Sequence, residues 1–120
     1  MTISTEPSPP ESTAPPVTIY KSLQGQKALV TGANSGIGKA VGIALGQAGA
    51  DVVVNYVAGE EAANVVVDET RNAGANAYAH QADVSSETDV AGMFKHMIKE
   101  WGTIDILVNN AGLQRDSAFH

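Results

Sequence analysis

A glycine-rich stretch at residues 31–38, with the sequence Thr-Gly-Ala-Asn-Ser-Gly-Ile-Gly, lies between a short apolar run and a longer segment of helical periodicity. A glycine-rich turn from a strand into a helix lets the backbone approach a pyrophosphate, and the helix N-terminus presents free N–H groups and the positive end of its dipole. We expect Gly32 to make the turn, Gly36 to permit close approach of the phosphate and Gly38 to let the helix pack against the strand. The stretch therefore predicts a phosphate-binding loop, and the alternative is a tight turn that binds nothing.

The P-loop of nucleoside triphosphatases is a competing interpretation, because Gly38 and Lys39 resemble its Gly-Lys pair. Five residues separate Gly32 from Gly38, one more than the P-loop motif has, and Ala40 stands where that motif needs a magnesium-binding Ser or Thr. The spacing therefore disfavours triphosphate hydrolysis.

The elements that must position this loop are short β-branched runs alternating with segments of helical period, a pattern typical of βα units around a parallel sheet. We predict strands over 27–31, 51–55, 76–81 and 104–109. The second and fourth runs are almost continuously aliphatic, as expected for strands that helices cover on both faces. Right-handed crossovers then place helices on both sides of the sheet.

Three helices connect these strands, and Gly49, Gly74 and Gly102 follow them as expected left-handed C-terminal residues. The third helix begins with a capping-box pattern at Ser86 to Asp89. The expected inward faces are, in chain order, Ile37, Val41, Ala44, Leu45 and Ala48; Ala63, Val66, Val67 and Thr70; and Val90, Phe94, Met97, Ile98 and Trp101.

Composition excludes several classes of function. The net charge is -6, and the seven basic residues are scattered, so no basic stripe is expected for nucleic acid. The longest aliphatic runs fall far short of the ~20 residues of a membrane span, and the N-terminus does not read as a secretory signal. There is no cysteine and the three histidines lie far apart, so we expect no metal site and a cytoplasmic location.

The composition changes sharply near residue 20. All five prolines lie in the first sixteen residues, whereas all twelve glycines lie from Gly25 onward. A segment rich in Pro, Ser and Thr cannot bury enough apolar surface to offset its ordering entropy. We therefore expect residues 1–20 to be a disordered tail and residues 21–120 to form the folded part.

Three motifs in order resemble the classical short-chain dehydrogenase/reductase family: Thr-Gly-x-x-x-Gly-Ile-Gly at 31–38, Asp83-Val84 after the third strand, and Asn-Asn-Ala-Gly at 109–112. The stretches around 52–64 and 110–113 are most similar to the glucose 1-dehydrogenase and 3-oxoacyl-reductase branches. The resemblance implies an α/β fold with a Rossmann-like doubly wound parallel sheet. Only the N-terminal βαβαβαβ part of that sheet would be present.

The resemblance also implies a nicotinamide dinucleotide cofactor and a small-molecule alcohol or carbonyl substrate, with a sugar such as glucose among the candidates. Asp83 with Val84 would contact the adenine, although a helix-cap or turn role for Asp83 is the alternative. Asn109 would tie strands together within the sheet. The cofactor-binding residues that the resemblance implies are Gly32, Asn34, Ser35, Gly36, Ile37 and Gly38 in the loop, Asp83 and Val84, and Asn110, Ala111 and Gly112 on the ribose side.

Asn55 occupies the end of the second predicted strand, where an acidic residue would bind the ribose 2′-OH of NAD and repel the 2′-phosphate of NADP. Asn55 is neutral, and the basic residues that receive this phosphate in the family are missing, since Ser35 precedes Gly36 and Tyr56 follows Asn55. We expect both cofactors to be accepted with a slight preference for NADP. Asn55→Asp is expected to shift the preference toward NAD.

The catalytic residues that the resemblance implies are a Tyr, a Lys four residues later and a Ser, all beyond the Asn-Asn-Ala-Gly motif. No Tyr-x-x-x-Lys occurs here, and the sequence ends eight residues past that motif. We therefore expect the truncated N-terminal part of an oxidoreductase that is homotetrameric when intact, with no catalytic residue and no dehydrogenase activity in the 120 residues themselves. The last strand would then be an exposed apolar edge. The alternative is a non-catalytic dinucleotide-binding sensor or partner module.

Overall fold

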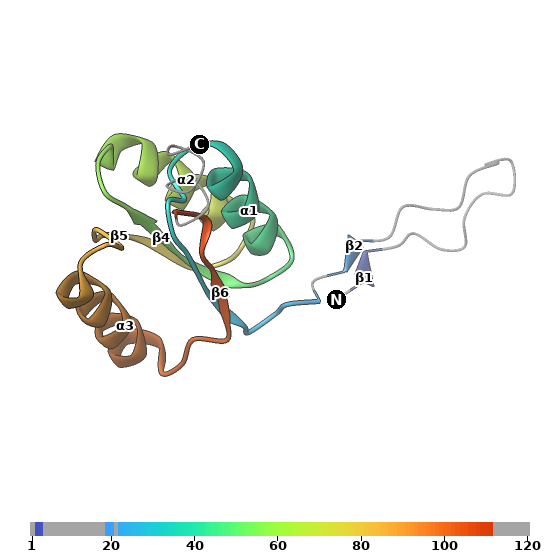
Figure 1. Cartoon of the computed structure of the whole chain (residues 1–120). Helices are drawn as coiled ribbons and strands as arrows, with labels where there is room; N and C mark the ends of the chain where they lie inside the picture. The colour runs from blue at the N-terminus through green and yellow to red at the C-terminus, as the bar shows by residue number, and fades with distance from the viewer. Residues whose placement is uncertain (1, 4–18, 21, 112–120) are drawn as a thin grey trace, which may run out of the picture.

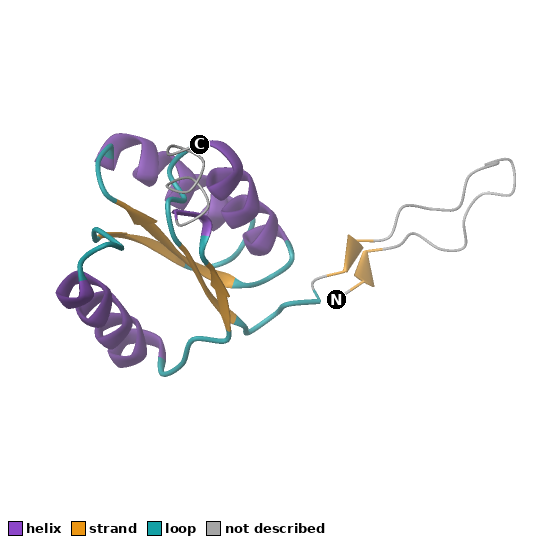
Figure 2. Cartoon of the chain, in the orientation of Figure 1, coloured by secondary structure: helices purple, strands orange, loops and turns teal. Residues whose placement is uncertain are grey.

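The computed structural model describes residues 2–3, 19–20 and 22–111. Its centre is a four-stranded sheet in which every pairing is parallel, formed by β3 (Lys27–Val30), β4 (Asp51–Tyr56), β5 (Ala77–Gln81) and β6 (Ile106–Val108). The helices are α1 (Gly36–Gln47), α2 (Glu60–Asn72) and α3 (Glu87–Trp101). Helices α1 and α2 cover one face of the sheet and α3 covers the other (Figures 1 and 2). The predicted α/β class and βαβαβαβ order are confirmed.

The strand order is β5-β4-β3-β6, so the chain moves outward from β3 to β5 and then returns to the other side of β3. Lys27 pairs with Asp51, and Val30 pairs with both Val54 and Val108. The carboxyl ends of β3, β4 and β6 therefore lie together along one side of the sheet, which we call its carboxyl edge. In open α/β sheets, ligands bind at such an edge, at the point where the strand order reverses.

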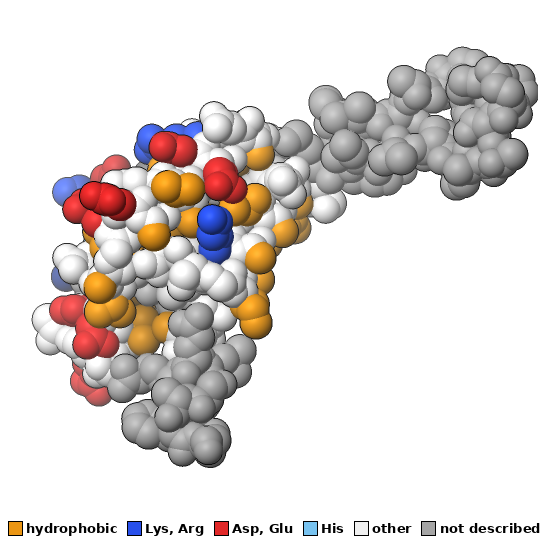
Figure 3. All heavy atoms as spheres, turned by 90° about the horizontal axis from the view of Figure 1, so that it is seen from above, with side chains coloured by type: hydrophobic (Ala, Val, Ile, Leu, Met, Phe, Trp, Pro, Cys, Tyr) orange, Lys and Arg blue, Asp and Glu red, His pale blue; other side chains and the backbone are white. Residues whose placement is uncertain are grey.

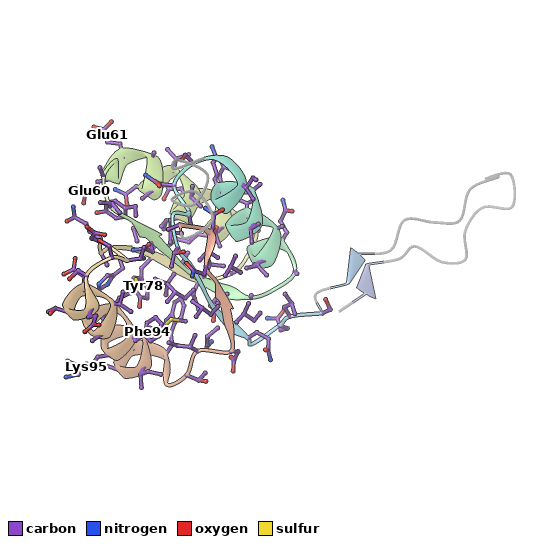
Figure 4. All side chains as sticks on the ribbon, viewed as in Figure 1. Glu60, Glu61, Tyr78, Phe94 and Lys95 are labelled. Carbon is purple, nitrogen blue, oxygen red and sulfur yellow. The ribbon has the colours of Figure 1, made fainter. Side chains whose placement is uncertain are left out.

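The sheet separates two apolar cores, because successive strand residues point to opposite faces. Val30, Val52 and Val54 pack with Val66 and other residues toward α1 and α2. The α3 side uses larger side chains: Leu29 and Val53 pack against Met93 and Met97, and Tyr78, Phe94 and Trp101 border this cluster. Figure 4 shows Tyr78 and Phe94 between the sheet and α3, whereas Lys95 points away from the sheet.

The predicted inward face of α1 is wrong at two positions, since Ile37 is 73% exposed and Ala44 is also exposed. Val41, Leu45 and Ala48 are only half-buried. The buried residues of α1 are Gly38, Gly42 and Gly46, one every four residues. Without side chains on this face the helix approaches its neighbours closely: a Cβ on Gly46 would lie 2.6 Å from Cγ2 of Thr70 on α2.

The predicted inward face of α2 is confirmed, because Ala63, Val66, Val67 and Thr70 are its buried residues. In α3 the prediction is wrong for Ile98, which is 47% exposed, and Met93 and Met97 are the buried positions. The Ser86 side chain accepts a hydrogen bond from the Asp89 N–H at 3.2 Å, so half of the predicted capping box forms. The three expected glycines all have positive φ, at Gly49, Gly74 and Gly102.

Strand β6 is shorter than predicted and lies at one edge of the described sheet, where Leu107 is 53% exposed. Much of the predicted tail, residues 1 and 4–18, lies outside the described residues. Within 1–20, the structure pairs β1 (Thr2–Ile3) with β2 (Ile19–Tyr20) as a short antiparallel ladder, which the sequence did not predict. None of the described helices is long and apolar enough to cross a membrane.

Candidate dinucleotide-binding site

The predicted site residues follow the carboxyl ends of β3, β4, β5 and β6. The loop at 31–38 leads from β3 into α1, Asn55 is near the end of β4, Asp83 follows β5, and Asn110 follows β6. The parallel topology brings these segments, far apart in sequence, to the same end of the sheet. The face in Figure 3 shows acidic side chains interspersed with a few basic ones, in keeping with the net charge of -6.

Gly32 makes the turn after β3 with a φ of +59°. Its N–H donates to Asn55 Oδ1 at 3.2 Å, and its carbonyl accepts from Asn110 Nδ2 at 3.1 Å. The next N–H, of Ala33, donates to the backbone carbonyl of Asn55 at 2.8 Å. The first part of the loop is therefore held from two sides, by Asn55 within β4 and by Asn110 just after β6.

Gly38 must be a glycine in this arrangement. A Cβ there would lie 2.2 Å from the Gly32 carbonyl oxygen and 2.6 Å from Asn110 Nδ2, distances at which backbone would have to move. Gly36, the first residue of α1, has a φ of +57°, which L side chains rarely adopt. The predicted roles of Gly32 as the turn and Gly38 as the close-packing residue agree with this geometry.

The N-terminus of α1 presents its N–H groups at this edge. An α-helix leaves the N–H groups of its first turn without intrahelical acceptors. Ser35 is the N-cap residue and makes no side-chain cap hydrogen bond, and Ser35, Gly36 and Ile37 are exposed. This combination of open donors and positive dipole is suited to an anionic group such as a phosphate.

The side chain of Asn34, another predicted ligand, is directed to the loop at 57–59. Its Nδ2 donates to the Ala58 carbonyl at 2.7 Å, and Gln81 Nε2 donates to the Val57 carbonyl at 3.0 Å. Gly59 caps the N-terminus of α2 with a φ of +89°, and a Cβ on it would lie 2.9 Å from Asn34 Nδ2. Asn34 and Gln81 therefore fix the loop between β4 and α2 through its backbone.

The Asn55 side chain does not face the solvent-exposed side of the candidate site, where a group that contacts the ribose would lie. Asn55 is 0% exposed, its Oδ1 accepts from Gly32, and its Nδ2 donates to the carbonyls of His80 at 3.2 Å and Ala82 at 3.1 Å. The amide faces backbone on all sides, so the structure gives no support to the expectation that it contacts the ribose 2′ position. The sequence indicated the place of Asn55 at the end of this strand and not the direction of its side chain.

Asp83 lies at the turn into α3 and makes the contacts of a turn residue, which are compatible with either role expected from the sequence. Its Oδ1 accepts from the Ser85 N–H at 2.9 Å and from Ser85 Oγ at 2.6 Å, while its own N–H donates to Asp89 Oδ2 at 3.0 Å. Its neighbour Val84 lines an apolar cavity of about 280 Å³ together with Thr31, Ser85, Val90, Met93, Phe94, Leu107 and Asn109.

The two asparagines after β6 have different environments. Asn109 is exposed, and its Oδ1 accepts from Thr31 Oγ1 at 3.3 Å, which agrees with its predicted role as a tie within the sheet. Asn110, predicted to line the ribose side, is 3% exposed, and its side chain is directed to Gly32. The Ala111 N–H donates to Thr31 Oγ1 at 3.0 Å, and Gly112 lies outside the described residues.

Two histidines, His80 and His96, lie side by side near this end of the sheet. His80 and His96 have ring centroids 5.4 Å apart, and no set of three metal-binding side chains occurs in the described part of the chain. Burial lowers the pKa of His80, and His96 lowers it further, against a smaller opposing effect of Asp89. Burial, with a smaller effect of Glu100, raises the pKa of Tyr78 to about 12.

A parallel sheet whose strand order reverses beside a glycine turn and an open helix N-terminus is typical of the dinucleotide-binding class of α/β proteins. The family model described as short chain dehydrogenase matches residues 26–120. The chain belongs to the short-chain dehydrogenase family.

Relatives of known name support the same assignment. The 3-oxoacyl-[acyl-carrier-protein] reductase FabG of Staphylococcus aureus is 41% identical over 92 residues, which cover 77% of this chain and 37% of that protein. A hydroxysteroid dehydrogenase from Escherichia coli is 42% identical with a TM-score of 0.69, over 74% of this chain and 37% of that one.

Another solved structure, 7α-hydroxysteroid dehydrogenase complexed with NADH and 7-oxo glycochenodeoxycholic acid, is also 42% identical with a TM-score of 0.69, over 74% of this chain and 34% of that one. None of these three relatives is named for a sugar. The chain spans 37% of the length of the curated relatives that it matches.

Proposed function

We propose that this chain forms the dinucleotide-binding part of an NAD(P)-dependent oxidoreductase, which transfers hydride between a nicotinamide cofactor and an alcohol or carbonyl substrate. The observation that carries the proposal is the loop at 31–38, in which Gly32 is held by two asparagines and Gly38 leaves no room for a Cβ. The α1 N-terminus that follows has the donors and dipole that a diphosphate requires.

The residues proposed to surround the cofactor separate into two groups by their contacts. Ser35, Gly36 and Ile37 are exposed and offer backbone donors to the diphosphate. A second group supports these three residues through hydrogen bonds or close packing. For Asp83 and Val84 we propose a place beside the adenine. The supporting residues are Gly32, Asn34, Gly38, Asn55 and Asn110.

We propose that the cofactor can be either NAD or NADP, with a slight preference for NADP. Support for accepting both comes from the end of β4, where no acidic side chain stands to repel a 2′-phosphate: Asn55 is neutral and buried, and Tyr56 follows it. Titration of both reduced cofactors by fluorescence would contradict this if the affinities differed by more than about a hundredfold, or ~2.7 kcal/mol. One relative was solved with NADH, and this does not indicate which of the two cofactors this chain prefers.

For the substrate we propose a carbonyl group on an extended, largely apolar molecule. The relatives named for an oxoacyl chain and for a steroid favour this over a sugar, which was one of the candidates from the sequence. Hydride transfer is proposed for the protein expressed from its complete reading frame, because the 120 residues contain no Tyr-x-x-x-Lys. Cofactor binding without turnover by that protein would favour the sensor alternative.

The binding proposal is tested by NADH and NADPH titration of the wild type and of Gly38→Ala, with Gly92→Ala as the matched control. A Cβ on Gly38 would displace the Gly32 carbonyl, whereas a Cβ on Gly92 of α3 meets nothing within 4 Å. We expect Gly38→Ala to weaken binding by at least about tenfold, or ~1.4 kcal/mol, and Gly92→Ala to leave it unchanged. Equal affinities of the two variants would contradict the proposed site.

A further inference from the structure

Asn55 connects three backbone segments at the carboxyl edge of the sheet. Its side chain accepts from Gly32 after β3 and donates to His80 and Ala82 at the end of β5, while its own carbonyl accepts from Ala33. The residue is completely buried. Through these bonds the end of β4 is joined to both neighbouring strand ends.

Only an asparagine amide matches these partners. The carboxamide has an acceptor oxygen and a nitrogen with two protons, and the site supplies one N–H donor and two carbonyl acceptors. An ionised aspartate would set a carboxylate oxygen against two carbonyl oxygens, and a leucine of similar shape would leave buried backbone groups unpaired. A protonated aspartate could still accept from Gly32 and donate one hydrogen bond.

The pairing also decides which donors of the loop remain for a ligand. The N–H groups of Gly32 and Ala33 are used by Asn55, so the donors left toward an anion begin at the N-terminus of α1. The bond to the Ala82 carbonyl joins Asn55 to the residue that directly precedes Asp83, on the proposed adenine side of the site. A displacement of Asn55 would therefore move the phosphate side and the adenine side relative to each other.

We propose that Asn55 is a positioning residue of the cofactor site, which holds the glycine turn through its Oδ1 and the end of β5 through its Nδ2, and which does not contact the ribose 2′ position. This inference rests on the proposed function for the identity of the ligand. Its structural part, the clamp on Gly32 and the end of β5, can be measured without any cofactor.

The test compares Asn55→Asp and Asn55→Leu with Asn64→Asp, the same chemical change at an exposed position of α2. Hydrogen exchange of the Gly32 amide and titration of NADH and NADPH are followed from about pH 8 to about pH 5 in the protein expressed from its complete reading frame. Burial raises the pKa of a carboxyl group, so an aspartate at this site gains its proton at a higher pH than an exposed aspartate does.

For Asn55→Asp we expect exchange at Gly32 at least about tenfold faster and cofactor affinity at least about tenfold weaker at the higher pH, with both recovering as the pH falls. In Asn55→Leu, exchange at Gly32 should be faster and cofactor affinity weaker at every pH. Asn64→Asp should change neither quantity. His80, Asp83 and Asp89 are the titratable residues near this position, and burial lowers the pKa of His80, so the wild-type profile is subtracted.

A loss in Asn55→Asp that is the same at every pH would overturn the proposal, as would a switch of preference from NADP to NAD with Gly32 still protected. If Gly32 responds as expected and the wild type binds neither cofactor, the proposed function fails and the clamp stands. If the variants fail to fold, a measurement on the wild type still tests the clamp that Asn55 forms on Gly32 and the end of β5. The Asn55 side-chain amide protons should exchange slowly with solvent, and rapid exchange would refute the clamp.

Discussion

The two ends of the central sheet are joined by different chemistry. At the amino end, charged side chains bridge the strands: Lys27 Nζ pairs with Asp51, and Asp51 Oδ1 accepts from the Asn76 N–H at 2.9 Å. The backbone N–H of Lys27 donates to Asp105 Oδ2 at 2.8 Å. At the carboxyl end the corresponding bridges are neutral, made by Asn55 and Asn110.

This difference follows from what each end has to do. A carboxylate can accept from backbone N–H groups and strengthen the contact through its charge, which suits an end that only holds strands together. At the end where the proposed site binds a diphosphate, a buried carboxylate beside the loop would repel the ligand. An amide satisfies the same backbone groups without charge, so asparagine suits a structural bridge placed next to an anion site.

The largest effect is expected for Asn110→Asp, which converts a carboxyl-end bridge to the amino-end chemistry. Its Nδ2 donates to the Gly32 carbonyl, and a buried carboxylate would face that oxygen without a proton between them. We expect a loss of about 2 to 3 kcal/mol in the free energy of unfolding, measured by urea denaturation, and weaker NADH binding. Stability equal to that of Asn64→Asp would show that this bridge contributes nothing.

The reverse exchange, Asp51→Asn at the amino end, should be milder. An asparagine at 51 can still accept from the Asn76 N–H. The loss is limited to the ion pair with Lys27 and to the charge that strengthens the Asn76 contact, and we expect about 1 kcal/mol in total. Cofactor affinity should not change, because Asp51 lies at the other end of β4 from Asn55. Asp68→Asn, at an exposed position of α2, is the control. A weakened affinity in Asp51→Asn alone would break the division between the two ends.

The amino acid pattern was sufficient to predict the elements of this fold, because strands such as 51–55 and the inward face of α2 are decided by apolar periodicity. It failed for α1, where Ile37 is apolar and exposed while Gly38, Gly42 and Gly46 form the packed face. Hydrophobic periodicity gives glycine no weight as a packing residue. The glycine spacing of four residues was the available signal, since it marks a face that can approach a sheet closely.

The candidate site was predictable as a location and only partly as a set of contacts. The loop at 31–38 and the strand ends after β5 and β6 can be found by motif and spacing. The direction of the Asn55 side chain could not, because a polar residue at the end of a strand is compatible with facing either solvent or backbone. The burial of the whole of β4 was a usable clue, since a central strand covered on both faces leaves its polar residues to pair internally.

A smaller effect is expected for Lys27→Met at the amino end. Lys27 Nζ pairs with Asp51 and lies 5.7 Å from the centre of the Trp101 ring, while its side chain keeps 23% of its surface exposed. Partly exposed contacts of this kind contribute about 0.5 kcal/mol. The Trp101 fluorescence should change with little loss of stability, and Lys95→Met on the outer face of α3 should change neither (Figure 4). A loss as large as that of Asn110→Asp would mean that charge matters equally at both ends.

The smallest effect concerns acid pH at the carboxyl end. Burial and the neighbouring His96 hold the pKa of His80 below its usual 6.5, so the folded protein binds this proton less readily than the unfolded chain does. The stability that neutral His80 contributes is therefore complete above about pH 6.5 and falls as the pH drops below that value. Because the His80 carbonyl accepts from Asn55, exchange at Gly32 should quicken slightly in the same range. His80→Asn should flatten this dependence, and an NMR titration that places the pKa of His80 above 6.5 would reverse the predicted sign.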